Sequence, residues 1–100
     1  MPDVRYLIPQ QAGDRRCTVT TRQGKHDQTN KNCIRRVSDF VGEHDQTPRI
    51  IYIVHGWNEG PGEDWIQPMV DAIRDRDDNK KNAVIGLVSW HRAHEKSGLR

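Results

Sequence analysis

A chain of 100 residues with a formal net charge of +2 has room for one small domain or for part of a larger one, since domains usually span roughly 100–200 residues. Only 33% of its residues are hydrophobic, which predicts a thin core, and no apolar run approaches the ~18 residues of a membrane-spanning helix. The start at Met1 lacks a charged region followed by an apolar one, so the sequence as given predicts no export signal.

The N-terminal third predicts one strand and a polar connection. Residues 4–8 are rich in β-branched and aromatic side chains and end before Pro9, which favours a strand. Residues 13–32 are polar and rich in turn formers, apart from a short strand candidate at residues 18–21. We therefore expect the segment of residues 13–32 to be a loop or an edge hairpin.

Cys17 and Cys33 lie in polar surroundings, where neither is expected to be buried as a small hydrophobe. A disulfide between them fits an oxidising compartment and free thiols fit a reducing one, so the sequence leaves their state open. Two cysteines without a Cys/His cluster do not make a zinc site.

The middle of the chain predicts a strand followed by a helix. Residues 50–54 form a β-branched and aromatic run that is typical of a strand buried on both faces. After a Gly- and Pro-rich loop, Asp64 is the expected N-cap of a helix that ends near Arg76, with Trp65, Ile66, Met69, Val70 and Ile73 at helical spacing. Pro68 predicts a late or distorted first turn.

Residues 83–90 are a second near-continuous apolar run of strand length. Strand, helix and strand predict one βαβ unit, and thus an α/β fold with mostly parallel strands. One clear helix cannot cover both faces of such a sheet, so we expect an incomplete sheet and treat residues 1–100 as the N-terminal fragment of a larger domain.

The charged segments predict neither a nucleic-acid partner nor a metal. Basic and acidic residues alternate in residues 74–81, whereas a nucleic-acid site needs a one-sided basic patch with aromatic residues beside it. The pair His91 and His94 beside Glu95 lacks a third ligand at regular spacing. We predict no metal and no cofactor.

The end of the strand at residues 50–54 is the strongest candidate for chemistry. His55-Gly56-Trp57 follows it directly, and ligands of open α/β sheets bind outside the carboxyl ends of strands. In hydrolases of this architecture a backbone N–H of the corresponding loop is one of two oxyanion donors. Trp90 ends the next strand and is a candidate pocket wall.

Four stretches resemble the N-terminal part of the pancreatic-type (neutral) lipase family of α/β-hydrolases. Residues 3–8 are similar to the family's opening strand, and residues 49–57 to its strand and oxyanion loop in order and spacing. Asp64-Trp65 matches the helix start, and residues 84–90 resemble the next strand, although Ser89 stands where the family commonly has Asp. The resemblance implies a partial α/β-hydrolase fold, secretion, a lipid ester substrate, and the oxyanion-donor role for the backbone N–H of Trp57.

The chemistry of that family also needs a Ser in a G-x-S-x-G elbow, followed by an Asp and a His. None of the three serines, Ser38, Ser89 and Ser97, has glycine two residues before and two after it. We therefore expect no esterase activity from these residues alone, and expect the rest of the domain to complete the sheet. The alternatives are a non-catalytic, lipid-binding relative of the yolk-protein kind and a stand-alone interaction protein with an obligate partner.

Overall fold

The computed structural model describes residues 3–11, 13–20, 26–43, 49–56, 64–76 and 82–90. Four strands and two helices lie within these ranges. In chain order they are β1 (Asp3–Ile8), β2 (Arg15–Val19), α1 (Gln28–Glu43), β3 (Arg49–Val54), α2 (Ile66–Arg76) and β4 (Ala83–Ser89). The predicted strands at residues 4–8, 50–54 and 83–90 are thus confirmed, and so is a helix that ends at Arg76.

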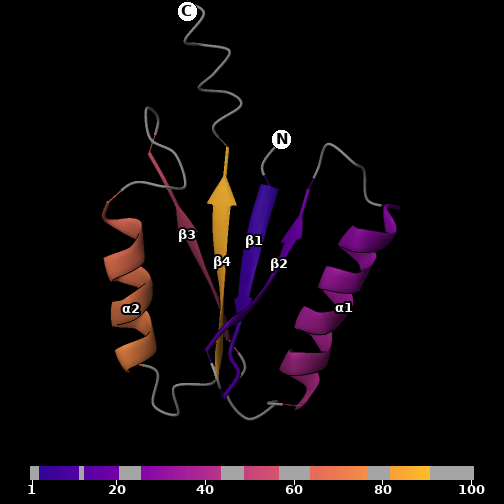
Figure 1. Ribbon diagram of the computed structural model, residues 1–100, viewed down its shortest axis with the longest axis horizontal. Coiled ribbons are helices and arrows are strands. Elements are labelled where there is room, and N and C mark those ends of the chain that lie inside the picture. Colours follow the sequence, from indigo (N-terminus) through magenta and orange to yellow (C-terminus); the bar gives the residue numbers. More distant parts are fainter. Residues whose placement is uncertain are drawn as a thin grey trace, which may run out of the picture.

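The strands form one mixed sheet in the order β2-β1-β4-β3, which Figure 1 shows with α1 beside β2 and α2 beside β3. β3 and β4 are parallel, whereas β1 is antiparallel to both β2 and β4. The α/β class and the βαβ unit β3-α2-β4 are confirmed, but the prediction of mostly parallel strands is wrong. The reason is that the first strand of the chain enters the sheet beside β4 in the opposite direction and continues into an edge hairpin with β2.

Helix α1 is the element that the sequence analysis missed. Asp27 caps it, since its Oδ1 accepts hydrogen bonds from the backbone N–H of Thr29 at 2.9 Å and of Asn30 at 3.3 Å. Buried side chains then recur at helical spacing, at Asn30, Cys33, Val37 and Phe40. The expectation of a single helix was therefore wrong, because a narrow apolar stripe suffices for a helix that packs on the sheet with one side.

The two helices cover opposite faces of the sheet. Leu7 packs with residues of α2, whereas its neighbour Ile8 packs with residues of α1, and successive side chains of a strand point to opposite faces. The α2 side holds Leu7, Ile53, Ile66, Val70 and Ile85, and the α1 side holds Ile8, Val37, Phe40 and Val84. Each face of the sheet thus has its own small hydrophobic core.

Strand β3 departs from the prediction of burial on both faces. Ile53 is buried on the α2 side, but Ile50, Tyr52 and Val54 are 39%, 51% and 56% exposed. These three side chains alternate with Ile53 and lie on the α1 side, where α1 packs on β1 and β2. β3 also has a single neighbouring strand in the described sheet, so its apolar composition is that of a central strand in an edge position.

Helix α2 begins at Ile66, so Pro68 lies in its first turn, where a backbone N–H has no intrahelical partner to lose. The helix buries Ile66 and Val70 against the sheet, and Trp65 and Ile73 pack beside them. Met69 is 45% exposed, which corrects its assignment to the core stripe. Met69 lies off the stripe of α2 that packs on the sheet, which consists of the buried Ile66 and Val70 and the partly buried Ile73.

Arg74 of α2 makes hydrogen bonds at the end of the sheet where β1 ends and β4 begins. Its guanidinium donates to both carboxylate oxygens of Asp14, at 3.1 and 3.3 Å, and to the backbone carbonyl of Leu7 at 3.1 Å. It also donates to the carbonyl of Ala83. One partly buried side chain thus joins the β1–β2 turn, the end of β1 and the start of β4.

Candidate functional site

The carboxyl ends of the parallel strands β3 and β4 bring His55, Gly56 and Trp90 together. The register pairs Val54 with Val88, so the residues that follow these strands leave the sheet at the same edge. His55 is 2% exposed, although it directly follows an edge strand. This is the edge at which open α/β sheets bind ligands.

The imidazole of His55 makes a hydrogen bond with each ring nitrogen. Nε2 lies 3.1 Å from the backbone N of Trp90, and Nδ1 lies 2.9 Å from the carbonyl oxygen of Gly56. A backbone N–H can only donate, so Nε2 accepts, and a carbonyl can only accept, so Nδ1 carries the proton and donates. The two partners therefore select a single tautomer of the neutral ring.

The indole of Trp90 holds the same histidine from a second side. Its ring stacks on the imidazole with centroids 5.1 Å apart and planes inclined by 2°. Its Nε1–H donates to the backbone carbonyl of His55 at 2.9 Å. Trp90 thus binds both the backbone and the ring of His55, and its predicted role as a pocket wall stays a prediction.

The residue to which the resemblance assigns the oxyanion N–H, Trp57, lies outside the described residues. His91, His94 and Glu95 lie outside them as well. The structure therefore places His55, Gly56 and Trp90 side by side and leaves the donor role of Trp57 a prediction.

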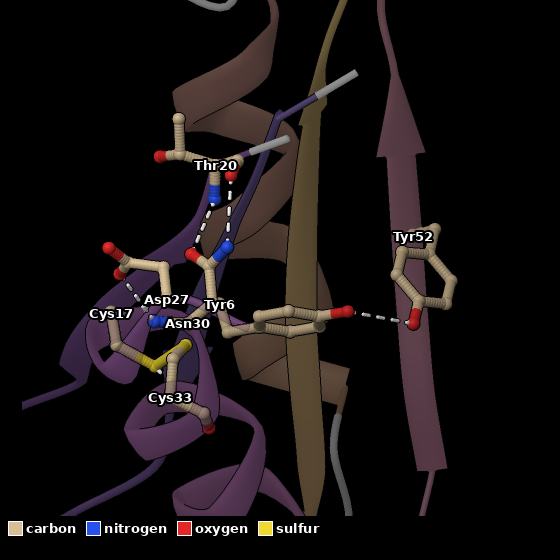
Figure 2. Close-up of a disulfide and its surroundings, with 7 residues drawn as sticks. All are labelled: Tyr6, Cys17, Thr20, Asp27, Asn30, Cys33 and Tyr52. Atoms are coloured by element: carbon tan, nitrogen blue, oxygen red, sulfur yellow. Dashed lines mark hydrogen bonds between the residues drawn. A yellow bond between two sulfur atoms is a disulfide. The ribbon is translucent and has the colours of Figure 1, made fainter. Parts of the chain in front are cut away.

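The state of the cysteines, which the sequence left open, is a disulfide between Cys17 of β2 and Cys33 of α1, with Cα atoms 5.5 Å apart. Figure 2 shows it beside Asn30, whose side-chain amide accepts from the N–H of Thr20 at 2.9 Å and donates to the carbonyl of Thr20 at 3.0 Å. Contrary to expectation Cys33 is 2% exposed, because it lies on the buried stripe of α1. The edge strand β2 is thus attached to α1 by one covalent bond, and Thr20, the residue that follows β2, is attached to α1 by a pair of hydrogen bonds.

A pair of tyrosines crosses β4 on the α1 side of the sheet. The hydroxyls of Tyr6 and Tyr52 lie 3.2 Å apart and their rings meet edge to face, as Figure 2 shows. Gly86 lies between them in the register, and its missing side chain leaves room for both rings. Burial, and then the hydrogen bond and charge of Tyr52, raise the pKa of Tyr6 from 10.0 to about 12.

A depression of about 410 Å³ lies at the other end of the sheet, between the end of β1 and the C-terminal half of α1. Its floor includes Ile8 and Phe40, and its rim carries charges of both signs from Arg15, Arg36, Asp39 and Glu43. Ile8 lies at the carboxyl end of β1, which runs antiparallel to β4, so the depression is remote from His55. Sequence reasoning had not singled it out, since its lining comes from a helix that was not expected.

Among the described residues no three metal-binding side chains cluster, and no helix there is long and apolar enough to cross a membrane. Comparisons of the chain with protein-family models, with curated proteins and with solved structures find no match.

Proposed function

We propose that this chain is part of a carboxylic ester hydrolase of the lipase kind, to which it contributes the oxyanion loop. The observation that carries the proposal is the buried His55, followed by Gly56, at the carboxyl end of β3 and before the connection to α2. In α/β-hydrolases one oxyanion donor comes from the loop between the third strand and the first following helix. The position of His55-Gly56 in a parallel β3-α2-β4 unit supports that role.

The loop acts when the ester carbonyl becomes tetrahedral and its oxygen takes up negative charge. A backbone N–H held about 2.7–3.1 Å from that oxygen stabilises the transition state, and removing one such donor costs about 10²–10³ in kcat. By resemblance the N–H is that of Trp57. The nucleophilic Ser, the Asp and the His of the triad are proposed to come from sequence beyond these 100 residues.

The uncovered side of β3 supports the need for more of the domain. Ile50, Tyr52 and Val54 expose apolar surface on the α1 side, and β3 has a single neighbouring strand in the described sheet. An edge strand with an apolar face is a site where further strands add. We propose that the rest of the hydrolase domain pairs with β3 and covers this face, and that lipid esters bind the completed domain.

The disulfide supports an extracellular location. Disulfides persist in oxidising compartments and are rare in the cytosol, and the bond between Cys17 and Cys33 joins two elements of the core structure. Secretion was also implied by the resemblance.

The proposal is tested by reading the natural transcript in both directions from the codons of Met1 and Arg100, and by assaying the encoded protein on short-chain and long-chain esters. A frame that contains G-x-S-x-G with a later Asp and His, and hydrolysis that is abolished by changing that Ser to Ala, are the expected results. A longer frame without the Ser, in a protein that binds lipid without hydrolysing esters, would replace the proposal with the lipid-binding relative. A stop after Arg100 would contradict the enzyme proposal.

A further inference from the structure

The hydrogen bonds of His55 connect Trp90, at the end of β4, with the backbone of Gly56, after β3. We propose that Trp90 and His55 form a positioning pair that fixes the carbonyl of Gly56, and with it the peptide unit to which that carbonyl belongs. The inference rests on the proposed function, since Gly56 belongs to the proposed oxyanion loop. Neither side chain is assigned a contact with substrate.

The hydrogen bonds form a chain from β4 to Gly56. The backbone N–H of Trp90 donates to Nε2 of His55, which places the ring proton on Nδ1, and Nδ1 donates to the carbonyl of Gly56. The opposite tautomer would lose both bonds, because Nε2–H would face an N–H and bare Nδ1 would face a carbonyl oxygen. The bond to Gly56 therefore depends on the bond from Trp90.

Trp90 also prevents the imidazole from turning. Its indole stacks on the imidazole, and its Nε1–H donates a hydrogen bond to the carbonyl of His55. Trp90 in turn follows β4, which is paired on both sides, so the pair is anchored in the centre of the sheet. The contacts of Trp90 with His55 therefore attach the carboxyl end of the edge strand β3 to the central strand β4.

A fixed carbonyl matters because a peptide unit is planar. Orienting the C=O of Gly56 orients the whole unit to which it belongs. Oxyanion donors are effective only when they already point to where charge develops. A pair that fixes this peptide before substrate arrives would supply that orientation.

Two substitutions of His55 separate positioning from simple packing. In His55→Asn the side-chain N–H₂ lies near the position of Nδ1 and can still donate to Gly56. In His55→Gln the amide reaches the position of Nε2, so it keeps the contact with Trp90 and loses the one with Gly56. A packing role favours the larger Gln, whereas a positioning role favours Asn.

The decisive measurement is nuclear magnetic resonance of the labelled chain at mildly alkaline pH, reading the imidazole ¹⁵N shifts and the carbonyl ¹³C shift of Gly56. We expect a protonated Nδ1 and a bare Nε2, and a hydrogen-bonded Gly56 carbonyl that persists in His55→Asn and is lost in His55→Gln. Trp90→Leu keeps the backbone N–H that selects the tautomer, so the ring proton is expected to stay on Nδ1. Loss of the stacked indole and of its Nε1–H frees the ring to turn, and is expected to move the Gly56 signal toward its value in His55→Gln. The matched control Trp65→Leu removes an indole that packs on the α2 core and leaves both signals in place.

The inference is overturned by a proton on Nε2 in the unmodified chain, or by a Gly56 signal that does not respond to Trp90→Leu. These readings need no activity, so they stand or fall separately from the transcript and ester assays that test the hydrolase. In the longer ester-hydrolysing protein, His55→Gln is expected to lower kcat by about 10²-fold at constant KM, as for the loss of one oxyanion donor, with His55→Asn close to the unmodified protein. Equal losses in both variants would assign His55 to stability alone.

Discussion

Replacing Gly86 with alanine tests how β4 accommodates the tyrosine pair. A Cβ at this position would lie 2.7 Å from Cδ1 and 2.8 Å from Cε1 of Tyr52, whereas carbon atoms pack best at about 3.5–4.0 Å. The ring of Tyr52 must therefore move. Since that side chain is half exposed, it can swing into solvent and give up its contacts with Tyr6.

The magnitude follows from what is lost and gained. The edge-to-face pair contributes about 1 kcal/mol and the exposed hydroxyl hydrogen bond about 0.5 kcal/mol. Alanine in place of a strand glycine stabilises by about 0.5–1 kcal/mol through the unfolded chain, and among the described glycines only Gly13 has a positive φ. The net expectation for Gly86→Ala is a loss of about 0.5–1 kcal/mol. In a Tyr52→Ala background the ring is absent, so the same change should stabilise by about 0.5–1 kcal/mol.

The assay is urea unfolding of the four proteins of this double-mutant cycle. The expected result is a reversal of sign between the two backgrounds. If Gly86→Ala destabilises both proteins equally, the rings are not what the glycine accommodates, and the reasoning is refuted.

Four further outcomes are expected. Asn30→Ala should cost about 2 kcal/mol in urea unfolding because it removes both hydrogen bonds to Thr20, the residue that follows β2, whereas the exposed Asn32→Ala should cost little. Arg74→Lys should cost about 2 kcal/mol, since an ammonium group cannot reach the same carbonyls and carboxylate, and an unchanged unfolding midpoint would contradict this. Reducing the disulfide should cost about 3 kcal/mol for a loop of this length and should first speed amide exchange in β2. Tyr52→Phe should lower the pKa of Tyr6 part of the way from about 12 toward 10.0, as read by phenolate absorbance. Because the folded pKa is the higher one, stability is full below pH 10 and falls as the pH rises toward 12, and Tyr6→Phe should remove that slope.

Strands and helices with a clear local pattern of apolar residues could be predicted from the sequence. The helical spacing of Ile66, Val70 and Ile73 predicted α2, and the apolar run at residues 83–89 predicted β4. Burial could not be predicted in the same way, since β3 has a similar composition to β4. Val84 is fully buried and Val54 is 56% exposed because strand order, which depends on long-range pairing, puts one strand in the centre and the other at the edge.

The position of the candidate site in the fold could be predicted from the sequence, whereas the contacts between its side chains could not. The position of His55 followed from the rule that ligands bind at the carboxyl ends of parallel strands. Its bonds with Trp90, thirty-five residues away, depend on the register of β3 and β4, which no local pattern encodes. Helix α1 is a different case, because Asp27 with Cys33, Val37 and Phe40 at helical spacing was a readable signal in a polar segment.

The strand order has a consequence for how the chain reaches its fold. β4 is the last strand along the described sequence, yet it lies between β1 and β3. During synthesis the β1–β2 hairpin and α1 can associate early, whereas β3 has no partner until β4 is made. β1 and β3 therefore each keep one edge unpaired until β4 inserts between them, which pairs residues up to 86 positions apart, such as Asp3 and Ser89. Such non-local closure slows folding and leaves the edges of β1 and β3 open to other chains until β4, which holds the fully buried Val84 and Ile85, has been inserted between them.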